Sequence, residues 1–228
     1  MGALRQWEDL PECMRNESVY PYYEALRRRR GALAAKRLLD ILLAAALLAV
    51  LWPACLVLAA LVKADSRGPA LFRQIRVTQY GREFRILKFR TMAAGAEGAG
   101  AQVTAADDLR VTRVGRRIRR CRLDEVPQLL NVLRGDMSFV GARPEVPRYV
   151  AAYTPEMYAT LLLPAGITGE ASIAFRDEAA LLAGAPDVDA AYVERVLPRK
   201  MELSLAEVRG FSLRRQMATM LRTVRAVL

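Results

Sequence analysis

Residues 41–62 constrain the fold most, because this stretch contains no charged side chain. At about 1.5 Å per residue, a helix of this length could cross a hydrocarbon core of about 30 Å. Pro53 lies near the middle of the stretch, where a proline removes a helical N–H group and clashes with the preceding turn. The stretch therefore predicts a membrane helix that bends at Pro53.

Basic side chains flank the apolar stretch on both sides. Those before it are Arg27, Arg28, Arg29, Arg30, Lys36 and Arg37, and those after it are Lys63, Arg67, Arg73 and Arg76. Basic flanks prefer the cytoplasmic face of a membrane, and a straight span would leave one flank outside. We therefore expect a re-entrant membrane helix hairpin over residues 36–64, kinked at Pro53, with Lys36 and Arg37 at its entrance. An ordinary transmembrane helix with a tolerated proline is the alternative.

The overall charge and the absence of histidine limit the function. The formal net charge is +11, which indicates an anionic partner such as phospholipid, nucleotide or nucleic acid. The chain contains no histidine, so a general base must be a carboxylate or an unusual Lys, Tyr or Cys, and His-ligated metal sites are excluded. Cys13, Cys55 and Cys121 have no metal-binding or disulfide-framework spacing, which favours a reducing, cytosol-facing compartment.

The remaining sequence predicts a small α+β domain. Residues 1–35 are polar and basic and read as an N-terminal membrane-proximal extension, whereas residues 65–228 suffice for one compact, cytosol-facing domain. Residue alternation and turn signals predict short strands at 71–78, 83–89 and 139–140. Residues 164–169 contain glycine and proline and are expected to form a rigid loop.

Helical periodicity marks the other segments of this domain. One helix is expected at 110–120, and a second is expected to begin at Asp124 or Glu125 and to end near Gly135, a suitable C-cap. Residues 187–207 are largely helical, with a kink or break at Pro198. The tail alternates apolar and arginine side chains in a basic amphipathic pattern, which suits either a membrane surface or packing against the domain.

Asp124 and Glu125 form the most chemically suggestive pair. Free N–H groups and the dipole at a helix start stabilise negative charge, so a carboxylate there should stay ionised near neutrality. Such a group suits a nucleophile or a metal ligand. The arginines just before the pair are suited to a polyphosphate and are Arg116, Arg117, Arg119, Arg120 and Arg122. The alternative is that both acids only cap the helix and balance these arginines.

Three further basic residues are candidates for anion binding. Lys88 and Arg90 alternate with apolar residues at the end of the second strand, although a half-exposed strand with solvated charges would look the same. Arg143 stands between a permissive glycine and Pro144, which fixes its backbone, and its guanidinium has the fork geometry that suits phosphate oxygens. A structural turn is the alternative for Arg143.

Taken in order, several long segments resemble the bacterial sugar transferase family, the monotopic phosphoglycosyl transferases. The matching segments are KRLLDILLAAALLAVLWPACLVLAALVKADSRGPALFRQIRV, FRILKFRTM, RRCRLDEVPQLLNVLRGDMSFVGARPE and PAGITGEASI. The resemblance implies a small α+β catalytic domain anchored by a re-entrant helix hairpin. It also implies transfer of a sugar-1-phosphate from a UDP-sugar to polyprenol phosphate, usually undecaprenyl phosphate, with release of UMP.

The same resemblance implies roles for individual residues. Asp124 would be the nucleophile that forms a covalent phosphosugar intermediate. Glu125 would act beside it as an acid/base, and the pair would organise the Mg²⁺ that the family requires. Arg119 matches a family arginine expected to contact phosphate. Three other matched positions are expected to bind the phosphates or nucleotide of the substrate, and they are Arg143, Lys88 and Arg90.

The chain departs from the family pattern at two places. Many members carry a tryptophan and then Gln-Val-Asn-Gly-Arg after the Gly-Ile-Thr-Gly segment, whereas this chain has a different sequence at 170–176. Trp52 stands before Pro53, where serine is frequent in the family. The first departure prevents any transfer of sugar specificity from the family to this chain.

The expected location is the bacterial inner membrane, with the active site facing the cytoplasm, because the donor is cytosolic and the acceptor is a lipid. The phospholipid bilayer is thus an expected partner, a homo-oligomer is compatible with the sequence, and nucleic acid is not an expected partner. The rival function is a membrane-tethered nucleic-acid-binding or regulatory protein. Against it, the arginine-rich stretch lacks the interleaved aromatic residues that stack on bases. A structural scaffold that presents the tail to lipid is a third possibility.

Overall fold

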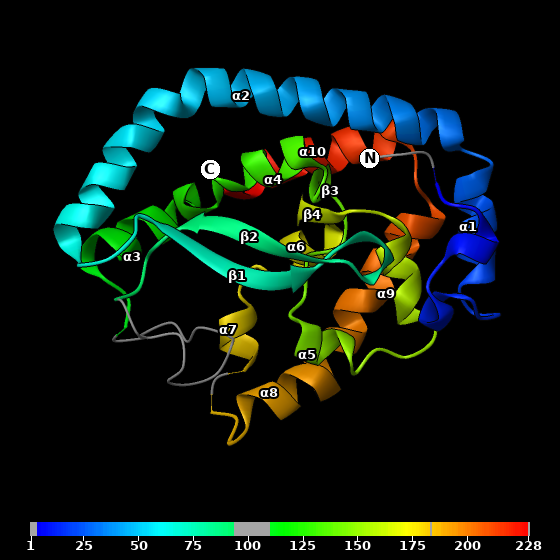
Figure 1. Ribbon diagram of the computed structural model, residues 1–228. Helices are drawn as coiled ribbons and strands as arrows, with labels where there is room; N and C mark the ends of the chain where they lie inside the picture. Colours follow the sequence, from blue (N-terminus) through cyan, green and yellow to red (C-terminus); the bar gives the residue numbers. More distant parts are fainter. Residues whose placement is uncertain (1–3, 94–109, 183, 228) are drawn as a thin grey trace.

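The computed structural model describes residues 4–93, 110–182 and 184–227. Helices dominate these residues, and two small two-stranded sheets lie among them (Figure 1). This mixture agrees with the expected α+β class.

A single long helix, α2 (Arg30–Asp65), forms the outer edge of the molecule. Figure 1 shows it running from α1 across the domain to α3, with its cyan part turning down toward α3. The helix is continuous, with Pro53 inside it, so the expected separation into two helical arms is not seen. Among the described residues, it is the one helix long and apolar enough to cross a membrane. Large apolar side chains on α2 are exposed, including Val50 at 74% and Trp52 at 58%.

Two neighbouring basic side chains fix α2 to the domain beneath it. Lys36 is buried and bonds to Asp40 one turn further along the helix, and its Nζ also donates to Ser138 Oγ over 2.6 Å. Arg37 donates to the carbonyl oxygens of Val132 and Leu133 over 2.6 and 2.9 Å. These contacts hold the first half of α2 against the domain, so the charge of Lys36 is enclosed rather than presented to a membrane surface.

The first sheet pairs β1 (Leu71–Val77) with β2 (Glu83–Phe89) in antiparallel register. The one-turn 3-10 helix η3 (Gln79–Gly81) joins them, and this hairpin confirms the two strands expected from the sequence. The buried side chain of Asn131 accepts a hydrogen bond from Leu87 N and donates one to the carbonyl oxygen of Arg85. This side chain therefore ties β2 to the neighbouring helix α4 (Gln128–Arg134).

The second sheet pairs β3 (Met137–Val140) with β4 (Ala165–Thr168) in parallel. The expectation of a rigid loop at 164–169 was therefore wrong for most of these residues, because hydrogen bonds to a strand distant in sequence make Ala165–Thr168 the strand β4. Gly166 is needed at this position, since a Cβ atom there would lie 2.3 Å from Gly141 N. This close approach fixes the backbone just before Arg143.

The segment with the acidic pair differs from the expected single helix start. After α3 (Arg113–Arg120), the short 3-10 helix η5 (Leu123–Glu125) precedes α4. The two acids therefore lie before the α-helix rather than in its first turn, because the chain makes a separate turn after Arg122, which has a left-handed φ of 55°. The expected end of the helix is confirmed, since Gly135 has a left-handed φ of 87° as its C-cap.

The N-terminal segment is part of the domain core. Its elements are η1 (Trp7–Asp9), η2 (Glu12–Met14) and α1 (Tyr20–Arg27). They pack on η6 (Met157–Leu162) and α9 (Leu197–Arg209). Met14, Val19 and Leu26 are completely buried in this shared core. The segment before α2 and the segments after it therefore fold into one domain with a common core (Figure 1).

Short helices and a terminal helix complete the domain. The short ones are α5 (Pro147–Val150), α6 (Glu170–Ala174), α7 (Glu178–Leu181), α8 (Val188–Ala191) and the π-helical turn η7 (Tyr192–Val196). The π turn ends just before Pro198, which lies in the first turn of α9, where a missing N–H group costs little. The tail forms α10 (Leu213–Val227) and leaves Met217, Leu221 and Val224 exposed.

Candidate active site

A polar cavity of about 420 Å³ contains both members of the acidic pair. Five arginines line it with them, namely Arg76 from β1, Arg119 from α3, Arg122 from the turn before η5, Arg143 from the loop after β3 and Arg176 after α6. The expected residues Asp124, Glu125, Arg119 and Arg143 therefore meet in one cavity, although they come from separate segments.

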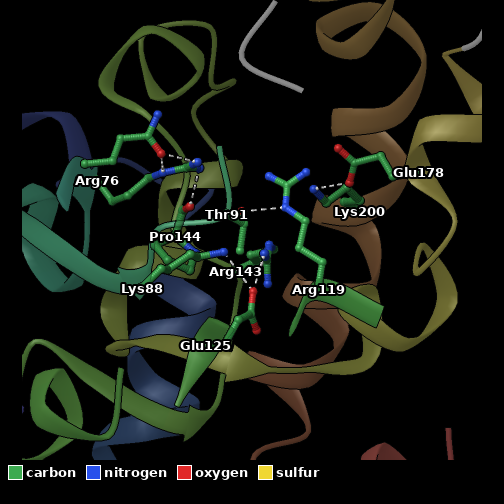
Figure 2. Close-up of polar contacts among 10 residues, drawn as sticks. Arg76, Lys88, Thr91, Arg119, Glu125, Arg143, Pro144, Glu178 and Lys200 are labelled. Carbon is green, nitrogen blue, oxygen red and sulfur yellow. Dashed lines mark hydrogen bonds and ion pairs between the residues drawn. The ribbon is translucent and has the colours of Figure 1, made fainter. Parts of the chain in front are cut away.

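Glu125 is held by two cations. Its Oε1 accepts hydrogen bonds from Lys88 Nζ over 2.8 Å and from Arg143 Nη2 over 3.0 Å (Figure 2). Burial alone would raise the pKa of Glu125, but the charges and hydrogen bonds of Lys88 and Arg143 outweigh burial and hold this pKa below its ordinary value. Glu125 is therefore a permanent anion near neutral pH, and Lys88, one of the residues predicted from the sequence, bonds to it directly.

Asp124 has a different environment from its neighbour. It is only 8% exposed, and burial raises its pKa, while the charge of Lys88 acts in the opposite direction. The sequence predicts that a helix start stabilises the ionised form of Asp124. In the structure, the favourable charges at Asp124 come instead from Lys88 and Arg119. Two adjacent carboxylates thus have pKa values shifted in opposite directions.

Arg143 is fixed by the backbone around it. Gly141 N donates to the carbonyl oxygen of Thr168 over 2.9 Å, and Gly166 N donates to that of Ala142 over 2.8 Å. Just beyond Arg143, the carbonyl oxygen of Pro144 accepts a hydrogen bond of 3.0 Å from Arg76 (Figure 2). The guanidinium is therefore presented from a rigid loop, as expected from the flanking glycine and proline.

Arg119 reaches the cavity from the last turn of α3. Its Nε donates to Thr91 Oγ1 over 2.8 Å, which orients the guanidinium (Figure 2). The helix comes close to Thr91 because residue 115 is glycine: a Cβ atom there would lie 2.2 Å from Thr91 O. The position of Arg119 thus depends on close contact between α3 and the end of β2.

Arg90 does not join the other predicted site residues. Its guanidinium donates to the carbonyl oxygens of Ser66 over 2.7 Å and of Arg67 over 2.8 Å, just after the last residue of α2. These contacts give no support to the expected phosphate-binding role, because they direct the guanidinium to the end of α2 and Arg90 does not line the cavity. Arg90 closes the end of α2, where helix carbonyl groups lack partners.

Several lining residues were not predicted from the sequence. They are Arg76, Glu145, Tyr149, Glu178, Tyr192 and Lys200. Glu145 ends a matched segment and so carried a weak signal, whereas Lys200 lies next to Arg199 in a mixed stretch and carried none. The others come from separate short elements, and nothing local in the sequence connects them.

The acidic pair fits a magnesium ion that shares its ligands with a phosphorylated substrate. Among the described residues, no group of three or more His, Cys, Asp or Glu side chains could hold a metal ion alone. Mg²⁺ is usually bound by one or two carboxylates together with substrate phosphates and water. Asp124 and Glu125 supply two carboxylates at one cavity, which satisfies that requirement.

The sequence is similar to known proteins along most of its length. The family model for bacterial sugar transferases matches residues 31–228. The UDP-N-acetylgalactosamine-undecaprenyl-phosphate N-acetylgalactosaminephosphotransferase of Aeromonas hydrophila is 38% identical over 197 residues, which are 85% of this chain and 43% of that protein. The UDP-glucose:undecaprenyl-phosphate glucose-1-phosphate transferase of Caulobacter vibrioides is 39% identical over 196 residues, 85% of this chain and 69% of that protein.

This chain spans less than half the length of the Aeromonas protein and about two thirds of the Caulobacter protein. Both relatives are named as transferases of phosphorus-containing groups to undecaprenyl phosphate. The family match includes all of α2 but its first residue, and every lining residue of the cavity. By this match, and by the cavity that gathers its motif residues, the chain belongs to the bacterial sugar transferase family.

Proposed function

We propose that this protein transfers a sugar-1-phosphate from a UDP-sugar to undecaprenyl phosphate and releases UMP. The observation that carries the proposal is the buried Asp124, which lies beside a permanently ionised Glu125 in a cavity lined by arginines. The names of the relatives support the substrates. The reaction would be the first membrane step in the assembly of a polysaccharide or other glycoconjugate.

In the first step, a carboxylate oxygen of Asp124 attacks the phosphorus that carries the sugar. A new phosphorus–oxygen bond forms, the bond to the bridging oxygen breaks, and UMP leaves with its electron pair. The burial that raises the pKa of Asp124 makes its carboxylate more basic and hence a better nucleophile. The product is a phosphosugar bound covalently to Asp124.

The surrounding cations favour this attack on a negatively charged phosphorus centre. Arg119 and Arg143 have the fork geometry that binds phosphate oxygens, and both line the cavity. Glu125 neutralises part of the charge of Lys88 and Arg143 and holds both in position. Asp124 and Glu125 would also hold Mg²⁺, which offsets phosphate charge when it is bound.

In the second step, an oxygen of the lipid phosphate attacks the same phosphorus. The bond to Asp124 then breaks, and the carboxylate returns to its starting state. The products are a polyprenol-diphosphate-sugar and a free enzyme. Since the bound phosphosugar and the lipid phosphate are both anionic, the same arginines would reduce their repulsion in this step.

The packing around α2 supports a re-entrant membrane topology. The segment before α2 and α9 after it share one core, and Tyr22 donates to Glu156 over 2.6 Å across that core. Both ends of α2 therefore belong on one side of the membrane, while its exposed apolar middle enters the lipid. We infer that this side is the cytoplasmic face of the inner membrane and that Pro53 eases the bend of the helix.

The reaction is tested by measuring UMP release from a panel of UDP-sugars, with Mg²⁺ and undecaprenyl phosphate, in detergent or nanodiscs. Wild-type protein should release UMP with at least one donor, and Asp124→Asn, which keeps the size of the side chain, should not. Glu83→Gln removes an exposed carboxylate on β2 and is the matched control. Intact-mass detection of a phosphosugar adduct on wild type would support the intermediate. Undiminished release from Asp124→Asn would contradict the role of Asp124.

The topology is tested with two exposed native cysteines, Cys13 before α2 and Cys121 after it. Single variants Cys13→Ser and Cys121→Ser leave one exposed reporter each. An impermeant maleimide applied to intact spheroplasts should label neither reporter, and labelling should appear in both after permeabilisation. Labelling of Cys13 alone in intact spheroplasts would instead support an ordinary span.

A further inference from the structure

The cavity contains a second group of charged side chains that the proposed chemistry does not use. This carboxylate–lysine cluster consists of Glu145, Glu178, Tyr192 and Lys200. Lys200 Nζ donates to Glu145 over 3.2 Å, to Glu178 over 2.9 Å and to Tyr192 Oη over 2.6 Å. Tyr192 Oη in turn donates to Glu145 over 2.6 Å. The cluster is thus a closed network built from four separate segments.

The cluster is enclosed in protein and still lines the cavity. Glu145 and Lys200 are each 4% exposed, and Tyr192 is 1% exposed. Such a buried ion pair contributes little to stability, because the loss of hydration offsets the attraction between the charges. Stabilisation of the fold therefore does not explain why these four residues are present. Their position in the lining of the cavity indicates a role in ligand binding.

The net negative charge of the cluster makes it a poorer site for a phosphate group than the arginines of the same cavity. The cluster carries two carboxylates against one ammonium group, whereas the rest of the lining contributes five arginines against Asp124 and Glu125. A phosphate is attracted to the arginines and repelled by Glu145 and Glu178. In Figure 2, the Lys200–Glu178 pair is drawn on the other side of Arg119 from Glu125. A donor whose diphosphate binds the arginines would bring an uncharged part to the cluster.

The hydrogen-bonding groups of the cluster favour a polyhydroxylated ligand. An ionised carboxylate only accepts hydrogen bonds, so Glu145 and Glu178 require partners that donate. A sugar offers several hydroxyl donors. A uracil ring offers a single N–H donor and two carbonyl acceptors, which would need the opposite set of protein groups. Ser172 adds a neutral group, since its enclosed Oγ lines the cavity without a hydrogen-bond partner in the described part of the chain.

We propose that Glu145, Glu178, Tyr192 and Lys200 form the subsite that reads the hydroxyl groups of the donor sugar. This inference rests on the proposed function, which supplies a nucleoside diphosphate sugar as the donor. Lys200 and Tyr192 orient the two carboxylates, and Glu178, the most exposed member of the network at 22% of its side chain, contacts the sugar.

Equilibrium binding tests the subsite without turnover. Dissociation constants of UDP and of UDP-sugar epimer pairs, such as UDP-glucose with UDP-galactose, are measured on full-length protein carrying Asp124→Asn. Glu178→Gln should lower the preference for one epimer by about tenfold and leave UDP affinity unchanged, because a lost hydrogen bond to a charged group has about this effect. Tyr192→Phe should act in the same direction. Glu202→Gln, on the exposed face of α9, should change neither quantity.

Three results would overturn the inference. A protein that binds all epimers equally well has no subsite for reading hydroxyl groups. Equal weakening of UDP and of UDP-sugar in Glu178→Gln would assign the cluster to the uridine instead. An unchanged epimer preference in both cluster variants would leave the network a structural role only. A different result would separate the two proposals. If the wild-type protein discriminates between epimers but releases no UMP, the proposed reaction is contradicted and the sugar subsite is not.

Discussion

Lys88 Nζ donates a 2.8 Å hydrogen bond to Glu125 Oε1 and thereby joins the end of β2 to the carboxylate beside Asp124. Replacing Lys88 with methionine keeps much of its length and removes its charge. Glu125 then remains buried with one cation fewer, so its pKa rises and the field around Asp124 becomes more negative. We expect UMP release to fall by about 100-fold.

Steady-state release of UMP from the preferred UDP-sugar measures this effect. Arg85→Met, on the exposed face of the same strand, is the control and should leave release unchanged. Wild-type turnover in a folded Lys88→Met protein would show that the ion pair has no part in the reaction.

Arg90 should affect stability rather than substrate binding. Its guanidinium bonds to the carbonyl oxygens of Ser66 and Arg67, so Arg90→Met leaves these groups without their donor. We expect the free energy of unfolding to fall by about 2 kcal/mol, as for other lost hydrogen bonds to a charged group. Denaturant unfolding measures the loss, and inhibition by UMP should be unchanged. A large rise in the UMP inhibition constant of Arg90→Met without loss of stability would instead indicate that Arg90 binds substrate.

Gly115 should be required for the position of α3. A Cβ atom at this residue would lie 2.2 Å from Thr91 O and 2.7 Å from Thr91 Cα, so Gly115→Ala must separate α3 from the end of β2. That shift breaks the hydrogen bond that orients Arg119. We expect both a lower melting temperature and a raised KM for the UDP-sugar.

Gly31→Ala is the matched control, because a Cβ atom there meets nothing within 4 Å and lies in helix α2. It should be neutral or slightly stabilising, since alanine restricts the unfolded chain. Equal melting temperatures for the two alanine variants would mean that α3 tolerates the added methyl group.

Glu207 should make the domain less stable as the pH rises. Burial raises its pKa to about 7, and the charge of Glu170 adds to this effect. The folded protein therefore binds a proton that the unfolded chain has lost, and stability decreases between about pH 4.5 and pH 7. At pH 8 the full cost, about 3 kcal/mol, is present.

Glu207→Gln removes this titration, and denaturant unfolding at pH 5 and pH 8 tests the prediction. The variant should be more stable than wild type at pH 8 and close to it at pH 5. Glu202→Gln, exposed on the same helix, should follow the pH dependence of wild type. A wild-type stability that rises from pH 5 to pH 8 would contradict a raised pKa of Glu207.

The sequence allowed prediction where the determinants are local. Alternation and a turn were enough for β1 and β2, and Gly135 marked the end of α4. The site residues Lys88, Asp124 and Arg143 were identified through family motifs. Asp124 and Arg143 line one cavity, and Lys88 bonds to Glu125 in the same lining.

Other features depend on contacts that no local pattern records. Gly166 belongs to a strand because β3 lies beside it, and Arg90 bonds to the end of α2 because the helix ends there. Lys200 and Glu145 are 55 positions apart, and a buried pair of this kind looks like two ordinary surface charges in the sequence. Contacts between residues distant in the sequence, and not local secondary-structure propensity, determine the structure at these positions.

The core shared by the N-terminal segment and α9 has a consequence for biosynthesis. Arg209 donates a hydrogen bond of 3.2 Å to Tyr22, and these two residues are 187 positions apart in the chain. A ribosome makes the N-terminal end first, so α2 leaves the tunnel long before the partner of its preceding segment exists. In the proposed topology, membrane entry of α2 therefore comes before the folding of its own N-terminal flank, and translation of α9 completes a core whose first half was made much earlier.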